Sequence, residues 1–217
     1  MLLRQLGEGR ALIVASQVVP KMWGFSQLPD TRSRTLTFAE DDRDTSCMTK
    51  VFRNESAKGG MAMSAEAIPW RSGRACFVVE ILEMRGRGAE GLEIGITDAS
   101  PERFIAHPTY AVLSRPSWVS SDAGCCWRHG TKLSRLSAWS EVKPIRLKSG
   151  DRVQFCLDMG GGIEVYVNDR LQVRWQQSDT DAPIFPKPVY ALVGLRAPLM
   201  ALSIELGEVP PSHASGS

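Results

Sequence analysis

The sequence LKSGDRVQFCLDMGGGIEVYVNDRLQ, residues 147–172, carries the clearest folding signal in this chain of 217 residues. Apolar and polar side chains alternate in Arg152–Met159 and again in Ile163–Asn168, which is typical of β-strands with one buried face. Three glycines at 160–162 separate the runs and predict a tight hairpin. Asn168 and Asp169 predict a second tight turn, because both tolerate a left-handed backbone. The side chains expected to face the core are Val153, Phe155, Leu157, Met159, Ile163, Val165 and Val167.

The same alternation recurs on both sides of this stretch. Three prolines, Pro183, Pro186 and Pro188, predict a loop between Gln176 and Val189. A helical period is found, if anywhere, in the first 20 residues. Many short strands that share one core predict an all-β, antiparallel two-sheet sandwich or a barrel. The further core positions are Phe77, Val79 and Ile81, then Leu92, Ile94 and Ile96, and finally Met200, Leu202, Ile204 and Leu206.

Composition narrows the class of protein. Hydrophobic residues make up 43% of the chain, and 26 basic against 24 acidic residues give a formal charge of +2. This balance argues against a nucleic-acid partner, which requires a basic excess. No apolar run approaches the roughly 18–20 residues that span a bilayer. The longest uninterrupted apolar stretch near the N-terminus, Ala11 to Ala15, is too short for a signal peptide. We expect a soluble, cytoplasmic protein.

Domain boundaries follow the same signals. Residues 1–22 form an N-terminal flank, residues 23–207 hold the sandwich domain, and residues 208–217, rich in Pro, Ser and Gly, form a tail expected to be flexible. The five cysteines are odd in number and lack the spacing of a disulfide framework or a metal site. Cys76 and Cys156 lie inside strand-like runs, so we expect buried, reduced thiols.

Six ordered blocks resemble the neuralized homology repeat (NHR), a member of the SPRY-like group of sandwiches. The blocks are residues 35–50, 59–81, 91–104, 116–130, 147–172 and 188–207. GLEIGITDASPERF resembles the family's "iGvT…dP" block, and GDRVQFCLDMGGGIEVYVNDRLQ resembles its "GD…G.l.~fVNg" block. Asp169 departs from the Gly that the family prefers after Asn. Gly194-Leu195 stands where the family usually has an acidic residue followed by an aliphatic or aromatic residue.

The resemblance implies a sandwich of concanavalin-type jelly-roll topology that binds proteins. It also implies the substrate-recognition part of a ubiquitin ligase, although this sequence has no Cys/His pattern of a RING. Catalytic signatures are missing too, since no GxSxG elbow, metal-ligand spacing or phosphate-binding glycine motif occurs. We therefore expect neither an enzyme nor a cofactor or metal site, and the three histidines are read as ordinary loop residues.

Partner binding is expected in the loops, which can vary without loss of the core. Tryptophan and arginine are typical of binding hot spots. The expected ligand is a short extended peptide, held by backbone hydrogen bonds, an aromatic anchor and an arginine. Whether Trp118 and Trp139 contact a ligand or support long loops stays open; Trp127 is expected to pack in the sandwich or at its rim. The expected binding surface combines three segments: Arg85–Glu90, Arg103–Trp118 and the turn around Arg128. The residues expected to bind the partner are Arg85, Arg87, Arg103, His107, Tyr110, Arg115, Trp118 and Arg128.

Two alternatives remain open at this stage. Basic loop residues, including Arg128, Lys132 and Arg135, are compatible with a sandwich that binds membrane phosphoinositide or glycans. The chain could instead be a structural subunit whose flank 1–22 docks to a larger assembly. Neither the oligomeric state nor the identity of the partner follows from the sequence.

Overall fold

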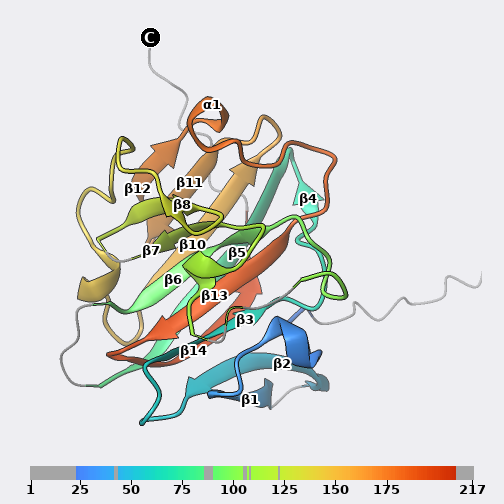
Figure 1. The fold of residues 1–217 in the computed structure, drawn as a ribbon, viewed down its shortest axis with the longest axis vertical. Coiled ribbons are helices and arrows are strands. Elements are labelled where there is room, and N and C mark those ends of the chain that lie inside the picture. The colour runs from blue at the N-terminus through green and yellow to red at the C-terminus, as the bar shows by residue number, and fades with distance from the viewer. Residues whose placement is uncertain are drawn as a thin grey trace, which may run out of the picture.

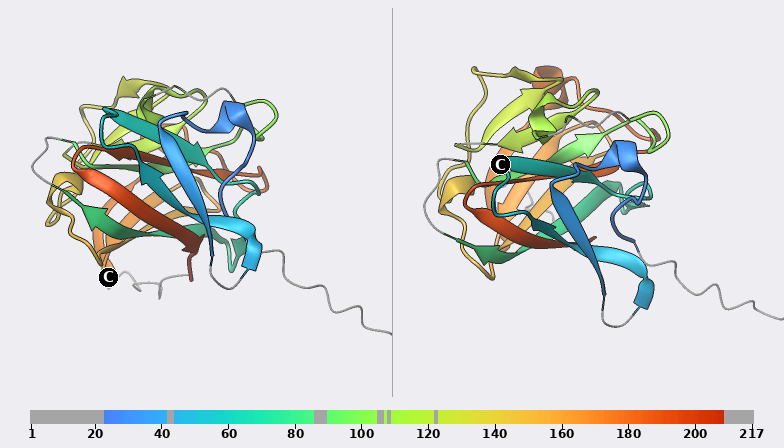
Figure 2. Two further views of the ribbon diagram at one scale, coloured as in Figure 1. Left: turned by 90° about the horizontal axis from the view of Figure 1, so that it is seen from below. Right: turned by 60° about the horizontal axis from the view of Figure 1, so that its bottom comes forward.

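The computed structural model describes residues 23–208, except 42–43, 86–89, 105–106, 108 and 122, and for residues 40–48 it describes the backbone alone. The expected flank 1–22, residues 209–217 of the expected tail, and Arg87 lie outside the described residues. Two sheets face each other (Figure 1), and Figure 2 shows them from two further directions. Every pairing between the described strands is antiparallel, as the sequence predicts.

The larger sheet has eight strands and the smaller sheet has six. In spatial order the larger sheet contains β1 (Leu36–Asp41), β2 (Asp44–Arg53), β14 (Leu199–Leu206), β5 (Arg74–Met84), β10 (Arg152–Asp158), β11 (Ile163–Val167) and β12 (Arg170–Trp175), with β4 (Trp70–Arg71) paired to β5. The smaller sheet contains β3 (Gly59–Met63), β13 (Tyr190–Arg196), β6 (Leu92–Thr97), β7 (Trp118–Ser121), β8 (Cys125–Arg128) and β9 (Thr131–Lys132). The short helices are η1 (Pro29–Thr31), η2 (Ala111–Leu113), η3 (Pro144–Arg146) and α1 (Gln177–Thr180). None of the described helices is long and apolar enough to cross a membrane.

The predicted hairpin is confirmed. β10 and β11 pair in register from Val153 opposite Val167 to Leu157 opposite Ile163. Asn168 and Asp169 both have positive φ, 48° and 65°, as the predicted tight turn requires. The alternation in β5, β6, β10 and β11 places the predicted apolar side chains in one cluster between the sheets.

Two core positions were predicted wrongly. Met159 lies just beyond the end of β10 and is 51% exposed. In β14 the pairing with β5 shifts between Leu199 and Ala201 and again before Leu202. This irregularity turns Leu199 into the core in place of Met200, whose sulfur instead lies 2.9 Å from Nη2 of Arg53. Leu202 and Ile204 face the core as expected.

A second apolar layer covers the outer side of the smaller sheet. Met61, Met63, Val119 and Leu192 point outward from their strands and pack against Phe104, Ala111 and Val112. These three residues belong to the connection between β6 and β7, whose helix η2 lies in front of β6 and β13 in Figure 1. We call the described residues of this connection, 98–104, 107 and 109–117, the covering segment.

The cysteine prediction needs correction, and the structure gives each of the three tryptophans its place. Cys76 and Cys156 lie directly opposite each other on β5 and β10 and form a disulfide, so they are not the free thiols expected. Their opposition could not be read from spacing, because 80 residues separate them. Trp118 begins strand β7 and is 5% exposed, although its polar neighbours suggest a loop. Trp139 is fully buried, and Trp127 is partly buried against the outer apolar layer.

Candidate functional site

The covering segment brings four of the predicted binding residues to one side of the molecule. Arg103, His107, Tyr110 and Arg115 all lie on it. Arg128 ends β8 directly opposite Trp118 on β7, immediately beside the point where the covering segment joins the smaller sheet. The four residues of the covering segment therefore lie over the outer side of the smaller sheet. The side chain of Arg128 is on the same face as that of Trp118, toward the other sheet, and pairs with Asp181 at the edge.

Local hydrogen bonds shape the middle of the covering segment. The imidazole Nδ1 of His107 accepts the backbone N–H groups of Thr109 and Tyr110, at 3.2 and 3.1 Å. The rings of His107 and Tyr110 are stacked with their centroids 5.5 Å apart. Ser114 donates its backbone N–H to the carbonyl of Ala111 and closes the single turn of η2. These hydrogen bonds hold the backbone of the segment, and so the positions of its side chains, in place.

The covering segment carries an exposed leucine. Leu113 is 40% exposed, although it follows two buried residues of η2. A Cβ at Gly130 would lie 3.5 Å from Nη2 of Arg115 and 3.8 Å from Cδ2 of Leu113, so the leucine and the guanidinium border the same turn. Neither Arg103 nor Arg115, both exposed, forms an ion pair with another residue of the described ranges. We call Arg103, His107, Tyr110, Leu113, Arg115 and Arg128 the recognition surface.

The remaining predicted residues take other positions. The indole N–H of Trp118 donates to the carbonyl of Thr180 at 2.9 Å, so its buried ring supports the surface from beneath. Arg85 follows β5 of the larger sheet and forms ion pairs with Glu55 and Glu83. Arg87 lies outside the described residues. Sequence reasoning missed Leu113, because a single leucine in a loop gives no signal of its exposure.

Electrostatics at the edge of the recognition surface are set by Arg128. Its guanidinium pairs with Asp181. Burial, and then the charge of Arg128, lower the pKa of His129 below its usual value. The Nδ1 atom of this histidine accepts the backbone N–H of Ser117 at 3.0 Å, which requires that nitrogen to be unprotonated. The neutral ring therefore fixes the end of the covering segment.

The described residues offer little support for chemistry. Burial raises the pKa of Cys126 to about 12, so its thiol stays protonated at neutral pH and is a poor nucleophile. No group of three or more His, Cys, Asp or Glu side chains in the described ranges could hold a metal ion. The arrangement is suited to binding through apolar contact and charge.

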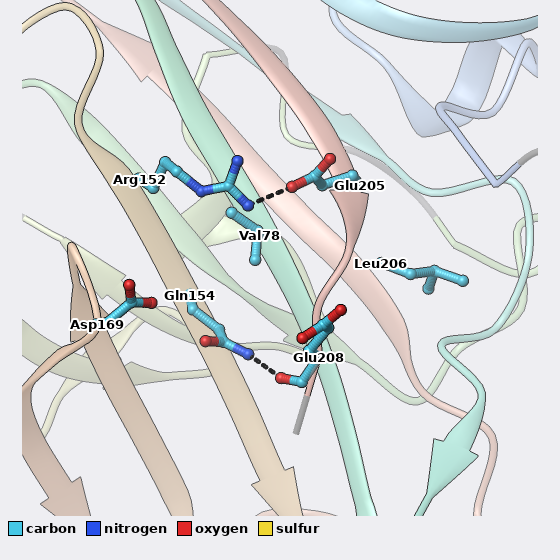
Figure 3. A pocket seen from close by; sticks show the side chains of 7 residues that line it. All are labelled: Val78, Arg152, Gln154, Asp169, Glu205, Leu206 and Glu208. Atoms are coloured by element: carbon cyan, nitrogen blue, oxygen red, sulfur yellow. Dashed lines mark hydrogen bonds and ion pairs between the residues drawn. The ribbon is translucent and has the colours of Figure 1, made fainter. Parts of the chain in front are cut away.

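Two grooves are lined by residues that do not belong to the recognition surface. One, of about 300 Å³, is on the outer side of the larger sheet and is lined by Val78, Arg152, Gln154, Asp169, Glu205, Leu206 and Glu208 (Figure 3). Arg152 pairs with Glu205 across it, and the amide of Gln154 donates to the carbonyl of Glu208. The other groove, also about 300 Å³, is lined by Lys132–Leu136 and Asp179. The sequence predicted neither groove, since each combines residues distant along the chain or in an irregular loop.

A third feature is an apolar end of the sandwich. Met159, Ile184 and Phe185 are 44–51% exposed and come from the β10–β11 turn and the loop after α1. The ring of Phe185 meets that of Trp70 edge-on, with centroids 5.4 Å apart, and its backbone N–H donates to the carbonyl of Met159 at 3.2 Å. The alternation in residues 152–159 predicts a core position for Met159, so this patch was not expected.

Comparisons with known proteins agree with the fold. The NHR1 domain of Neuralized from Drosophila melanogaster superposes with a TM-score of 0.57 at 14% identity, over 87% of this chain and 99% of that one. A solution structure of the NHR domain of the same protein gives 0.59 at 12%, over 85% and 92%. A human SPRY domain gives 0.51 at 14%, over 80% and 98%. At these identities the likeness concerns the fold.

A search of curated proteins by sequence gives no match. The family model for Neuralized, however, matches residues 44–205, which is well over half of the chain. The match includes the smaller sheet, the covering segment, and the larger sheet apart from β1 and the last residue of β14. The resemblance found in the sequence is therefore confirmed, and this chain belongs to the Neuralized family.

Proposed function

We propose that this domain is a non-catalytic module that binds a partner protein through the recognition surface. Neuralized and SPRY-like domains are in general protein-interaction modules. The observation that carries the proposal is the exposed Leu113 beside Arg115, which has no ion-pair partner among the described residues, on a segment fixed to the sheet. An apolar anchor within a polar rim is the arrangement that concentrates binding energy in protein interfaces.

The charges of the surface favour a particular ligand. Arg103 and Arg115 are exposed without an ion-pair partner among the described residues, and Arg128 stands nearby with its single described partner, Asp181. A short peptide that offers an apolar side chain and a carboxylate would match the leucine and the guanidinium groups. An affinity in the micromolar range, about 8 kcal/mol, is expected for one such module.

Affinity capture with variants tests this function. The purified chain is used as bait in an extract of cells that express it, and bound proteins are quantified by mass spectrometry. Leu113→Ser and Arg115→Glu should each reduce capture of the same partner about tenfold, as loss of a hot-spot contact does. Phe52→Ser is the matched control, because Phe52 is similarly exposed, at 37%, on β2 of the larger sheet. Undiminished capture by both site variants, or an equal loss with the control, would refute the proposed surface.

The finer role that we infer is substrate recognition within a ubiquitin ligase in the cytoplasm. The support is the family resemblance, which associates such domains with a RING or a cullin-adaptor box. Recovery of a RING protein or a cullin adaptor with the bait, reduced by neither Leu113→Ser nor Arg115→Glu, would separate ligase assembly from substrate binding. Location needs its own test by fractionation, because the Cys76–Cys156 disulfide is a bond that oxidising compartments favour.

A further inference from the structure

A buried carboxylate lies beneath the recognition surface. Glu93 points outward from β6, yet it is 0% exposed because the covering segment crosses above it. Its Oε2 accepts the backbone N–H groups of Ala111 and Val112, the latter at 3.3 Å, and these are the first two residues of η2. Its Oε1 accepts the hydroxyl of Ser121 at 3.3 Å. One side chain thus joins the smaller sheet to the turn that carries Leu113.

An arginine on the next strand completes this connection. Arg196 of β13 places Nη1 3.3 Å from Oε1 of Glu93, and its Nη2 pairs with Glu90. The guanidinium carbon lies 4.2 Å from the ring centroid of Tyr110, a distance typical of a cation–π contact. Glu93 therefore holds the backbone of η2, while its partner Arg196 holds the aromatic side chain just before it.

Space for the carboxylate comes from a glycine. Gly194 on β13 lies directly opposite Glu93 on β6. A Cβ at Gly194 would lie 2.6 Å from Oε2 of Glu93, closer than real Cβ atoms come to a neighbour. This contact gives a physical reason for glycine at a position where the sequence departs from the family pattern, since a larger side chain would displace the carboxylate.

We propose that Glu93 is a positioning residue for partner binding, which sets the conformation of residues 110–113 within the recognition surface. A charge removed from water is stable only where its partners are fixed around it, so the carboxylate favours one arrangement of η2 over others. Arg196 and Gly194 assist it, by charge and by leaving room. The inference rests on the proposed function, because it explains how that surface keeps its shape.

The test is amide hydrogen exchange at Ala111 and Val112, measured by NMR on the full chain. Glu93→Gln keeps the size of the side chain but removes the charge. It should accelerate exchange at both amides about tenfold or more, as expected for loss of charge-assisted hydrogen bonds. Gly194→Ala, which retains the charge but crowds the carboxylate, should accelerate exchange at the same two amides.

Glu164→Gln is the matched control. Glu164 is also buried, at 3% exposure, and it binds Arg74 and Tyr166, each at 2.7 Å, on the outer side of the larger sheet. This variant should lower the free energy of global unfolding. The exchange rates of Ala111 and Val112, compared with the rate expected from global unfolding, should stay unchanged. Unchanged exchange in Glu93→Gln, or the same acceleration in Glu164→Gln, would overturn the inference.

Capture of the partner by the same variants separates this inference from the proposed function. Glu93→Gln should weaken capture by about tenfold, whereas Glu164→Gln should not. If the two amides exchange faster in Glu93→Gln and capture is nevertheless intact, the hold of Glu93 on η2 stands and the proposed recognition surface is wrong. If neither exchange nor capture changes, the positioning role itself is wrong.

Discussion

Single residues in this domain are constrained by neighbours that the sequence does not place beside them. Gly95 interrupts an apolar run of β6, and in the sequence it is one more small residue. In the fold its backbone passes so close to β7 that a Cβ would lie 2.1 Å from the carbonyl oxygen of Trp118. The constraint is an interstrand contact across 23 residues of chain, which explains why the local pattern could not reveal it.

Gly95→Ala should therefore destabilise the domain by about 2 kcal/mol or more, because backbone must move to accommodate the methyl group. Gly160→Ala is the control, since the nearest atom to its Cβ would be a side-chain oxygen of Asp158 at 3.3 Å. It should change stability by less than about 1 kcal/mol. Denaturant unfolding of both variants measures the difference, and equal midpoints would show that the close approach of β6 and β7 is incorrect.

His129 gives a pH-dependent prediction. Its pKa in the folded state is lowered, chiefly by burial and then by Arg128, whereas the unfolded chain takes up the proton near pH 6.5. Above that pH the ring is neutral in both states. As the pH falls below it, the unfolded state binds the proton first and stability decreases. His129→Asn, which suits the positive φ of 50° at this position, should lose less stability between pH 7.5 and 5.5. An unchanged pH dependence in urea unfolding would contradict this account.

Among the elements, strands with regular alternation were predictable and strands without it were not. β10 and β11 follow a strict period of two, and their hairpin is formed as expected. β7 reads Trp-Val-Ser-Ser and is buried on both faces, because the covering segment lies over its outer side. Polar residues there resemble a loop, and no local signal tells that Ser120 and Ser121 are buried.

The turn after β11 allows a prediction at the scale of one element. Asp169 has φ of 65°, which costs a residue with a Cβ about 1 kcal/mol. Asp169→Gly should therefore stabilise the domain by about 0.5 kcal/mol, after part of the gain is offset by a more flexible unfolded chain. Asn168→Gly is the control and should not stabilise, because Asn168 Oδ1 accepts the N–H of Arg152 at 2.9 Å. A lower unfolding temperature for Asp169→Gly than for the original chain would contradict the turn geometry.

At the scale of the whole molecule, periodicity predicts strands but not the partners of their outer faces. The family resemblance predicts a two-sheet sandwich, and in a sandwich the apolar faces of the strands point to the shared core. It did not reveal that the covering segment lies over the smaller sheet, that Glu93 is buried beneath it, or that Trp118 is internal while Leu113 is exposed. The candidate site could thus be assigned to the correct stretch of chain but not to all the correct side chains.

The disulfide between Cys76 and Cys156 should matter to the whole domain. It joins β5 and β10 across 80 residues of chain, so it restricts the unfolded state strongly. Reduction should lower the free energy of unfolding by about 4 kcal/mol. A Cys76→Ala/Cys156→Ala variant should be insensitive to reductant. Equal unfolding midpoints of the original chain with and without reductant would argue against the bond.

The most direct test of partner binding is hydrogen exchange of the full chain, alone and saturated with the captured partner. Slower exchange in peptides that span residues 109–117 and 125–130 is predicted, with little change around the groove at Arg152 and Glu205 or at the apolar end formed by Met159, Ile184 and Phe185. Protection confined to either of those two regions, with the covering segment unaffected, would contradict the account.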